Sequence, residues 1–261
     1  MVILKGIFNN YDYIYAHYIS HTGFAPIFVK KTSANIKIVF NAHGNDVVSD
    51  DDNSKNVKRS KKYLKYAYKV VVPSKYYKDV RINDYNIKED KIFVYPSGGV
   101  DTNLFKKIDK NEAKKQAKLS NKYNYIGYVS KLERNKGYDV FLKAISLLKD
   151  NKELKKYKYL VVGSGSEEDK FKEMVKSLEL EDYLEIRNLV SQEELINIYN
   201  SLDVFVFPTY TKSESLGLVG LEAMSCEVIV ITSNKYGPTS YLVDNKNGFF
   251  FEKENSRSEE H

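Results

Sequence analysis

Short runs of β-branched and aromatic residues recur along the chain and alternate with segments of helical period. Runs of about four to eight such residues are typical of strands. They predict strands at residues 12–16, 36–41, 70–72, 92–95, 125–129, 159–163, 184–186, 204–207 and 228–232. Strands that alternate with helices form parallel sheets covered on both faces. We therefore expect an α/β fold that binds its ligand at the carboxyl ends of strands.

Two of the helical segments carry clear signals. In residues 138–148 one helix face gathers apolar side chains, namely Val140, Phe141, Ala144, Ile145 and Leu148. A second helix is expected to begin at Ser191, because Glu194 three residues later completes a capping box.

The stretch from about Asn103 to Lys122 is polar and interrupts this alternation. We place a domain boundary there and expect domains at residues 1–108 and 109–261. Charge supports the division, because residues 1–108 carry 18 Lys and Arg against 10 Asp and Glu, whereas residues 109–261 carry 23 against 25. The 42% hydrophobic content excludes a disordered or collagen-like chain.

Much of the positive charge lies in the segment Lys55–Lys65, where Tyr63 and Leu64 lie between cations and Tyr66 follows directly. One interpretation is a solvated helix face, and another is a surface that meets anionic lipid headgroups. Nucleic acid is disfavoured because no nucleic-acid-binding motif accompanies the charge. No apolar run reaches the roughly 20 residues of a membrane span, and no secretory signal is expected. A single cysteine, Cys226, suits the reducing cytoplasm.

The strongest candidate for chemistry is the segment ESLGLVGLEAM. Gly217 and Gly220 leave the start of a helix without bulky side chains, so its backbone N–H groups can approach a diphosphate. Glu222, further along the helix, can accept the hydroxyls of a ribose. Glu214 lies eight residues before Glu222, about 12 Å if the whole segment were helical, which is too far for the carboxylate pair of a glycosidase.

Cations follow another predicted strand in the segment SKLERNKG. Lys131 and Lys136 lie around its loop and can neutralise a diphosphate without a metal. We interpret the acidic run Asp50–Asp52 as a charge cluster at a helix N-terminus. The turn VVGSGSE has only Gly163 and Gly165, and it lacks the third glycine of the dinucleotide fingerprint, so a nicotinamide cofactor is disfavoured.

In the first half of the chain, histidines follow the carboxyl ends of two predicted strands. His43 and Asp46 come directly after the strand at 36–41, where a neutral imidazole can bind a sugar hydroxyl. The alternative is a histidine satisfied by the loop backbone. His17 and His21 follow the strand at 12–16 and carry less weight.

In chain order the motifs are HGND, YPSGGVDTNLF, SKLERNKG, VVGSGS and ESLGLVGLEAM. This succession resembles the family 4 glycosyltransferases, retaining enzymes of the GT-B fold. The resemblance covers about residues 12–252. It implies two Rossmann-like domains that face each other across a cleft, with an N-terminal acceptor domain that is incomplete here and a C-terminal domain that lacks its final helices.

The resemblance also assigns roles to single residues. Glu222 resembles the glutamate that accepts the ribose hydroxyls, and Glu214 the one near the transferred sugar. Lys136 matches the lysine that contacts the diphosphate, and Lys131 stands where the family usually has arginine. His43 resembles the histidine that reaches the donor sugar. The other residues implied in donor binding are Val190, Ser215, Leu216, Gly217 and Leu218.

These observations favour a glycosyltransferase that moves a sugar from a nucleoside diphosphate sugar to a saccharide or lipid-linked saccharide, in surface polysaccharide or glycolipid biosynthesis. It would need no cofactor and no metal, and would work in the cytoplasm or at the inner face of the membrane. The alternative is a shortened copy that binds a nucleotide sugar weakly, or only scaffolds a partner. An epimerase is disfavoured, because the spacing of Glu214 and Glu222 resembles that of transferases.

Overall fold

The computed structural model describes residues 11–33, 35–51, 54–96, 99–149, 151 and 155–252. The chain forms two compact units. The first contains Met1–Gly99 and Thr211–Leu216, and the second contains Val100–Tyr210 and Gly217–His261. The division after Gly99 comes earlier than the expected boundary after residue 108, because Val100, Leu104 and Phe105 pack into the core of the second unit.

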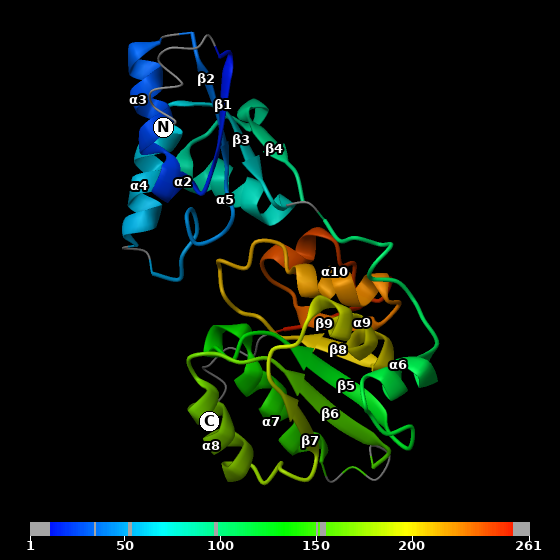
Figure 1. Cartoon of the computed structure of the whole chain (residues 1–261). Coiled ribbons are helices and arrows are strands. Elements are labelled where there is room, and N and C mark those ends of the chain that lie inside the picture. The colour runs from blue at the N-terminus through cyan, green and yellow to red at the C-terminus, as the bar shows by residue number, and fades with distance from the viewer. Residues whose placement is uncertain are drawn as a thin grey trace. The chain divides into compact units, whose positions relative to one another are not determined.

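The first unit contains a four-stranded parallel sheet in the order β1-β2-β3-β4. Its strands are β1 (Tyr13–His17), β2 (Lys37–Asn41), β3 (Ala67–Val72) and β4 (Ile92–Val94). Its helices are α2 (Ile19–Thr22), α3 (Phe24–Thr32), α4 (Lys55–Leu64), α5 (Lys75–Tyr85) and the 3-10 turn η1 (Glu89–Lys91) (Figure 1).

One face of this sheet carries the core of the first unit. Phe40 of β2 and Val72 of β3 are fully buried in one cluster with Ile27 of α3, Leu64 of α4 and Tyr77 of α5. The other face keeps large side chains exposed, among them Tyr13, Tyr15, Tyr68 and Phe93. The expectation of a sheet covered on both faces is therefore wrong for the described part of this unit, since its helices pack into a single cluster.

The second unit contains a six-stranded parallel sheet in the order β10-β9-β8-β5-β6-β7. Its strands are β5 (Asn124–Val129), β6 (Tyr157–Val162), β7 (Leu184–Arg187), β8 (Val204–Phe207), β9 (Ile229–Ser233) and β10 (Phe249–Phe251). Its helices are α6 (Lys110–Gln116), η2 (Arg134–Lys136), α7 (Tyr138–Leu148), α8 (Glu168–Ser177), α9 (Gln192–Ser201), α10 (Leu218–Ser225) and η4 (Gly237–Ser240).

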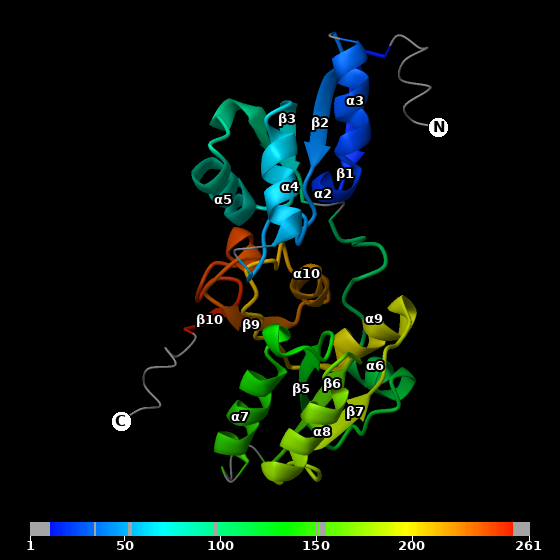
Figure 2. The same ribbon diagram turned by 90° about the vertical axis from the view of Figure 1, so that its left-hand side faces the viewer.

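Helices cover both faces of this second sheet, as Figure 2 shows. On one face α6, α9 and α10 pack on β5, β8 and β9, and Tyr199 and Phe205 lie in that cluster without solvent contact. On the other face α7 and α8 pack on β5 and β6 around Phe141 and Phe171. The helices on both faces leave the carboxyl ends of the strands to the connecting loops.

All nine expected strands are present, with ends that differ by up to three residues. Two elements were not predicted from the sequence: the short edge strand β10 (FFF), and α6, which lies inside the polar stretch at 103–122. The helix at 138–148 is confirmed, but its buried face is different: Tyr138, Phe141, Leu142 and Ile145 are buried, whereas Ala144 and Leu148 are exposed. The capping box at Ser191 is confirmed, with both of its hydrogen bonds formed.

Candidate functional site

The loop after β2 holds His43 in the first unit, and Asp46 organises this loop. The buried Asp46 carboxylate accepts hydrogen bonds from the backbone N–H groups of His43, Gly44 and Ile19, at 2.9–3.0 Å. A buried carboxylate needs such donors to offset the loss of water. Asp46 is therefore a structural anchor that places the His43 backbone.

The imidazole of His43 is half-buried between aromatic neighbours. The ring of Tyr18 stacks on it at 4.3 Å, and Nδ1 of His17 lies 2.8 Å from its Nε2. Burial lowers the pKa of His43, Asp46 raises it, and His17 lowers it. Because the pKa lies below its ordinary value, His43 is a neutral hydrogen-bonding group at neutral pH. His21 bonds instead to Ser20 Oγ, at 2.8 Å.

The segment Thr211–Leu216 is also part of the first unit and carries Glu214, Ser215 and Leu216. Asp50 accepts hydrogen bonds from Thr211 Oγ1 at 2.6 Å and from Lys212 N at 2.8 Å. The hydroxyl of Tyr77 donates to Ser213 O at 3.1 Å. These bonds hold the start of the segment, and Glu214 itself is half-buried.

The acidic run at 50–52 was expected to mark a helix N-terminus, and for Asp50 this is wrong. Ser54 precedes α4 as its N-cap, and the first turn of α4 contains no acidic residue. Asp50 lies four residues before that N-cap and uses both carboxylate oxygens on Thr211 and Lys212. Asp52 lies outside the described residues.

In the second unit the loop that follows β5 carries Lys131 and Lys136, and we call it the lysine loop. It is held by the buried Tyr128. The Tyr128 hydroxyl lies 3.2 Å from the carbonyl oxygen of Lys131 and 3.4 Å from that of Lys136. Burial raises the pKa of this phenol, so it remains a hydrogen-bond donor. The side chain of Lys131 is exposed and that of Lys136 is half-buried.

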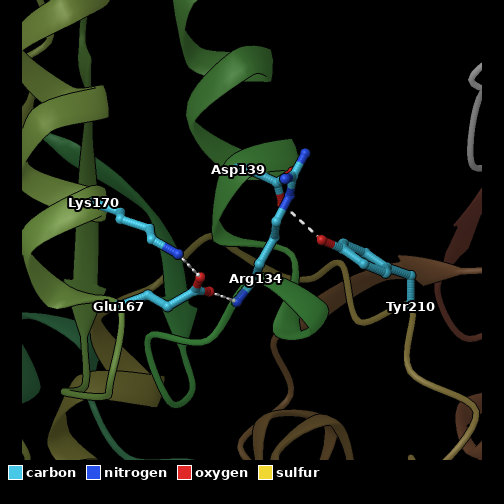
Figure 3. Close-up of polar contacts among 5 residues, drawn as sticks. All are labelled: Arg134, Asp139, Glu167, Lys170 and Tyr210. Carbon is cyan, nitrogen blue, oxygen red and sulfur yellow. Dashed lines mark hydrogen bonds and ion pairs between the residues drawn. The ribbon is translucent and has the colours of Figure 1, made fainter. Parts of the chain in front are cut away.

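Figure 3 shows a polar cluster that fixes the middle of this loop. The Glu167 carboxylate accepts from the backbone N–H of Arg134 and from Lys170 Nζ, the latter at 2.8 Å. Asp139, in the first turn of α7, lies 3.5 Å from Arg134 Nε and accepts from the Tyr210 hydroxyl at 3.4 Å. Burial, followed by the charge of Asp139, raises the pKa of Tyr210 to about 12. The sequence reasoning missed this cluster, because its members come from separate segments.

Glycines let the loops after β5, β6 and β8 approach one another closely. A Cβ on Gly163 would lie 1.9 Å from Ser130 O, and one on Gly137 would lie 2.0 Å from Pro208 O. Real Cβ atoms are essentially never closer than 3.0 Å to such an atom. Gly163 therefore serves the packing of the β6 loop onto the β5 loop.

Helix α10 starts at the other glycine-bearing segment. Gly217 is its N-cap with φ of 80°, a left-handed conformation that favours glycine. The Tyr241 hydroxyl donates to Gly217 O at 3.0 Å and would lie 2.3 Å from a Cβ on Gly220. The absent side chain of Gly220 thus makes room for Tyr241. Gly217 is itself buried, and a Cβ there would lie 2.7 Å from Cε1 of Phe207, so in the first turn of the helix the exposed residue is Leu218.

Glu222 lies on the second turn of α10 and is half-buried. Its Oε2 accepts a hydrogen bond from the Tyr199 hydroxyl at 3.0 Å. Burial raises the pKa of Glu222, and the Tyr199 bond partly offsets this. The sequence reasoning missed Tyr199, whose only signal was a tyrosine at an inward position of α9. Val190 is half-buried against the same core, directly before the N-cap of α9.

The structure therefore divides the expected site residues between the two units. His43, Glu214, Ser215 and Leu216 belong to the first unit. The second unit contains Lys131, Lys136, Val190, Gly217, Leu218 and Glu222. In the second unit these residues follow or flank β5, β7 and β8, and β5 and β8 are direct neighbours in the sheet.

Residues 109–259, more than half of the chain, match the family model described as glycosyl transferases group 1. The chain belongs to this family. The capsular polysaccharide biosynthesis glycosyltransferase CapM of Staphylococcus aureus is 34% identical over 177 residues, which are 64% of this chain and 43% of CapM. An uncharacterized glycosyltransferase of Methanocaldococcus jannaschii, MJ1178, is 27% identical over 248 residues, 94% of this chain and 62% of that protein. The glycosyltransferase chain thus spans less than two thirds of these relatives.

Solved structures confirm the expected GT-B fold of this glycosyltransferase. Anabaena HepE in complex with UDP and glucose has a TM-score of 0.77 at 20% identity, over 98% of this chain and 68% of that one. Sucrose-phosphate synthase from Thermosynechococcus elongatus has a TM-score of 0.78 at 22% identity, over 95% of this chain and 62% of that one. At this identity the likeness concerns the fold alone.

Proposed function

We propose that the protein is a retaining glycosyltransferase that moves a sugar from a nucleoside diphosphate sugar to an acceptor hydroxyl in surface polysaccharide or glycolipid biosynthesis. Membership of the group 1 glycosyltransferases and the 34% identity to CapM support this proposal. The observation that carries it is made in the second unit. There the half-buried carboxylate of Glu222, which accepts a hydrogen bond from Tyr199, occurs together with a loop at the end of β5 that carries Lys131 and Lys136.

Each of these groups has its own role in binding the donor. Lys131 and Lys136 neutralise the diphosphate, and they stabilise the charge that develops on it as it leaves. The first N–H groups of α10 add positive potential for the same anion. Tyr199 occupies one oxygen of Glu222, and the carboxylate accepts the ribose hydroxyls. Glu214 and His43 act at the transferred sugar. The donor site uses these groups and needs no metal.

Calorimetric titration with uridine and guanosine diphosphates tests the donor site. We expect saturable binding of at least one of them. Glu222→Ala should weaken nucleoside diphosphate binding and leave inorganic diphosphate binding unchanged, because its partners are ribose hydroxyls. Glu227→Ala, an exposed glutamate after the same helix, is the matched control. Equal losses for both ligands in Glu222→Ala would reject the ribose role. Binding without any transfer would support the non-catalytic alternative.

We further propose that α4 attaches the protein to the anionic inner face of a membrane, where a lipid-linked acceptor would be presented. The cations of this segment are all exposed: Lys55, Lys58, Arg59, Lys61, Lys62 and Lys65. Each is worth about 1 kcal/mol near an anionic surface at low salt. Among the described residues no helix is long and apolar enough to cross a bilayer.

Vesicle sedimentation tests this attachment. Binding should require anionic lipid and fall steeply between low and moderate salt. Lys61→Glu with Lys62→Glu should abolish it. The exposed pair Lys106 and Lys107 of the second unit, changed in the same way, controls for net charge. Binding that ignores lipid charge, or equal losses in both double variants, would show that α4 is only a solvated face.

A further inference from the structure

A pair of histidines lies at one edge of the first sheet. His17 is the last residue of β1, and His43 follows the last residue of β2 by two positions. The register of the two strands pairs His17 with Asn41. Because parallel strands end at the same edge, the two imidazoles meet there. Nδ1 of His17 lies 2.8 Å from Nε2 of His43.

The neighbouring amide of Asn41 favours one of the two possible donors. Two imidazole nitrogens at this distance share one proton, so one donates and the other accepts. Nδ2 of Asn41 lies 2.7 Å from the Tyr15 hydroxyl oxygen and 3.4 Å from Nδ1 of His17. An amide nitrogen only donates. This contact favours the tautomer in which Nδ1 of His17 accepts and the shared proton belongs to Nε2 of His43.

We propose that His17 is a positioning residue that holds His43 in its Nε2–H tautomer and so leaves Nδ1 of His43 as an acceptor for a hydroxyl of the donor sugar. The stacked ring of Tyr18 and the bond from the His43 N–H to Asp46 hold the residue in place while His17 sets its proton. The sugar contact rests on the proposed function, because it requires a bound nucleotide sugar.

The tautomer can be read without any ligand. Long-range ¹H–¹⁵N correlation spectra of ¹⁵N-histidine-labelled protein at about pH 7.5 distinguish protonated from bare ring nitrogens, and His43→Asn assigns the signal. We expect a protonated Nε2 and a bare Nδ1 on His43. A protonated Nδ1 on His43 at neutral pH would overturn the proposal, whatever the protein binds.

Variants at His17 test the consequence with UDP-glucose hydrolysis as the readout. His17→Asn places an amide oxygen near the position of Nδ1, so it can accept the hydrogen bond from His43, and His17→Asn should rescue the function of His17. His17→Leu does neither. At about pH 7.5 we expect about a tenfold loss in kcat/KM for His17→Leu and less than about a twofold loss for His17→Asn.

His21→Asn is the matched control, because His21 bonds to Ser20 and its replacement should leave kcat/KM unchanged. Melting temperatures identify any variant that fails to fold. Equal losses in kcat/KM for His17→Leu and His17→Asn, with both variants folded, would overturn the proposal. Failure of the wild type to bind either uridine or guanosine diphosphate would refute the proposed function, and the spectra would still decide the role of His17.

Discussion

Gly137 offers the sharpest test of how the lysine loop is built. It is the N-cap of α7, with φ of 82°, and a Cβ there would lie 2.0 Å from the carbonyl oxygen of Pro208. In Gly137→Ala the left-handed conformation costs about 1–2 kcal/mol. The loops after β5 and β8 must also move apart by about 1 Å, which adds about 1–3 kcal/mol of the kind seen for overpacking. We expect a total loss of about 2–5 kcal/mol in the free energy of unfolding.

Gly99→Ala is the matched control, because Gly99 has φ of 69° and open space around its Cβ position. It should lose only the conformational cost of about 1–2 kcal/mol. Urea unfolding followed by far-UV circular dichroism measures both losses. Hydrogen exchange should show faster exchange in α7 and at the end of β8 in Gly137→Ala alone. Because the loop carries Lys131 and Lys136, UDP affinity should fall as well. Equal stability losses in the two variants, with unchanged UDP affinity in Gly137→Ala, would refute this reasoning.

Four further predictions concern the Tyr199 hydroxyl, the Glu222 carboxyl, the Cys226 thiol and the need for a metal. Tyr199→Phe keeps a fully buried ring but removes the hydrogen-bond donor to Glu222. The free energy of unfolding should therefore fall by about 1–3 kcal/mol, and the affinity for nucleoside diphosphates should fall with it. No change in either quantity would mean that this bond does not form. Glu222→Gln removes a carboxyl whose pKa burial raises, and such a group destabilises the folded state increasingly as the pH rises above its unfolded value. The melting temperature of Glu222→Gln relative to wild type should therefore increase from pH 4 to pH 7, and a difference that does not change with pH would contradict the shift. Cys226 is buried and its thiol pKa is raised to about 11, so a thiol reagent should label it only after unfolding, and rapid labelling of the native protein would contradict its burial. Uridine diphosphate affinity should be unchanged by a chelator, because Lys131, Lys136 and the first amides of α10 supply the positive charge; a large loss would indicate a metal site.

The elements of this protein were readable from local sequence. Apolar runs and their spacing determined the nine expected strands, and Ser191 with Glu194 determined the start of α9. Such signals depend on residues a few positions apart, whose periodicity follows from helix and strand geometry alone. The short edge strand β10 and the polar helix α6 lacked that periodicity and were missed.

The contacts that define the candidate site needed the tertiary structure. Which face of α7 is buried depends on the sheet against which the helix packs. The Asp50 carboxylate accepts hydrogen bonds from Thr211 and Lys212, which are distant in sequence, and does not lie at the start of the nearby helix α4. Local sequence located Glu222 and the lysine loop, but the Tyr199 bond to Glu222 joins two helices. The contact of His17 with His43 depends on the register of β1 against β2, since a shift of one residue would turn His17 to the other face of the sheet. Register and packing are properties of the assembled sheet, which no single segment contains.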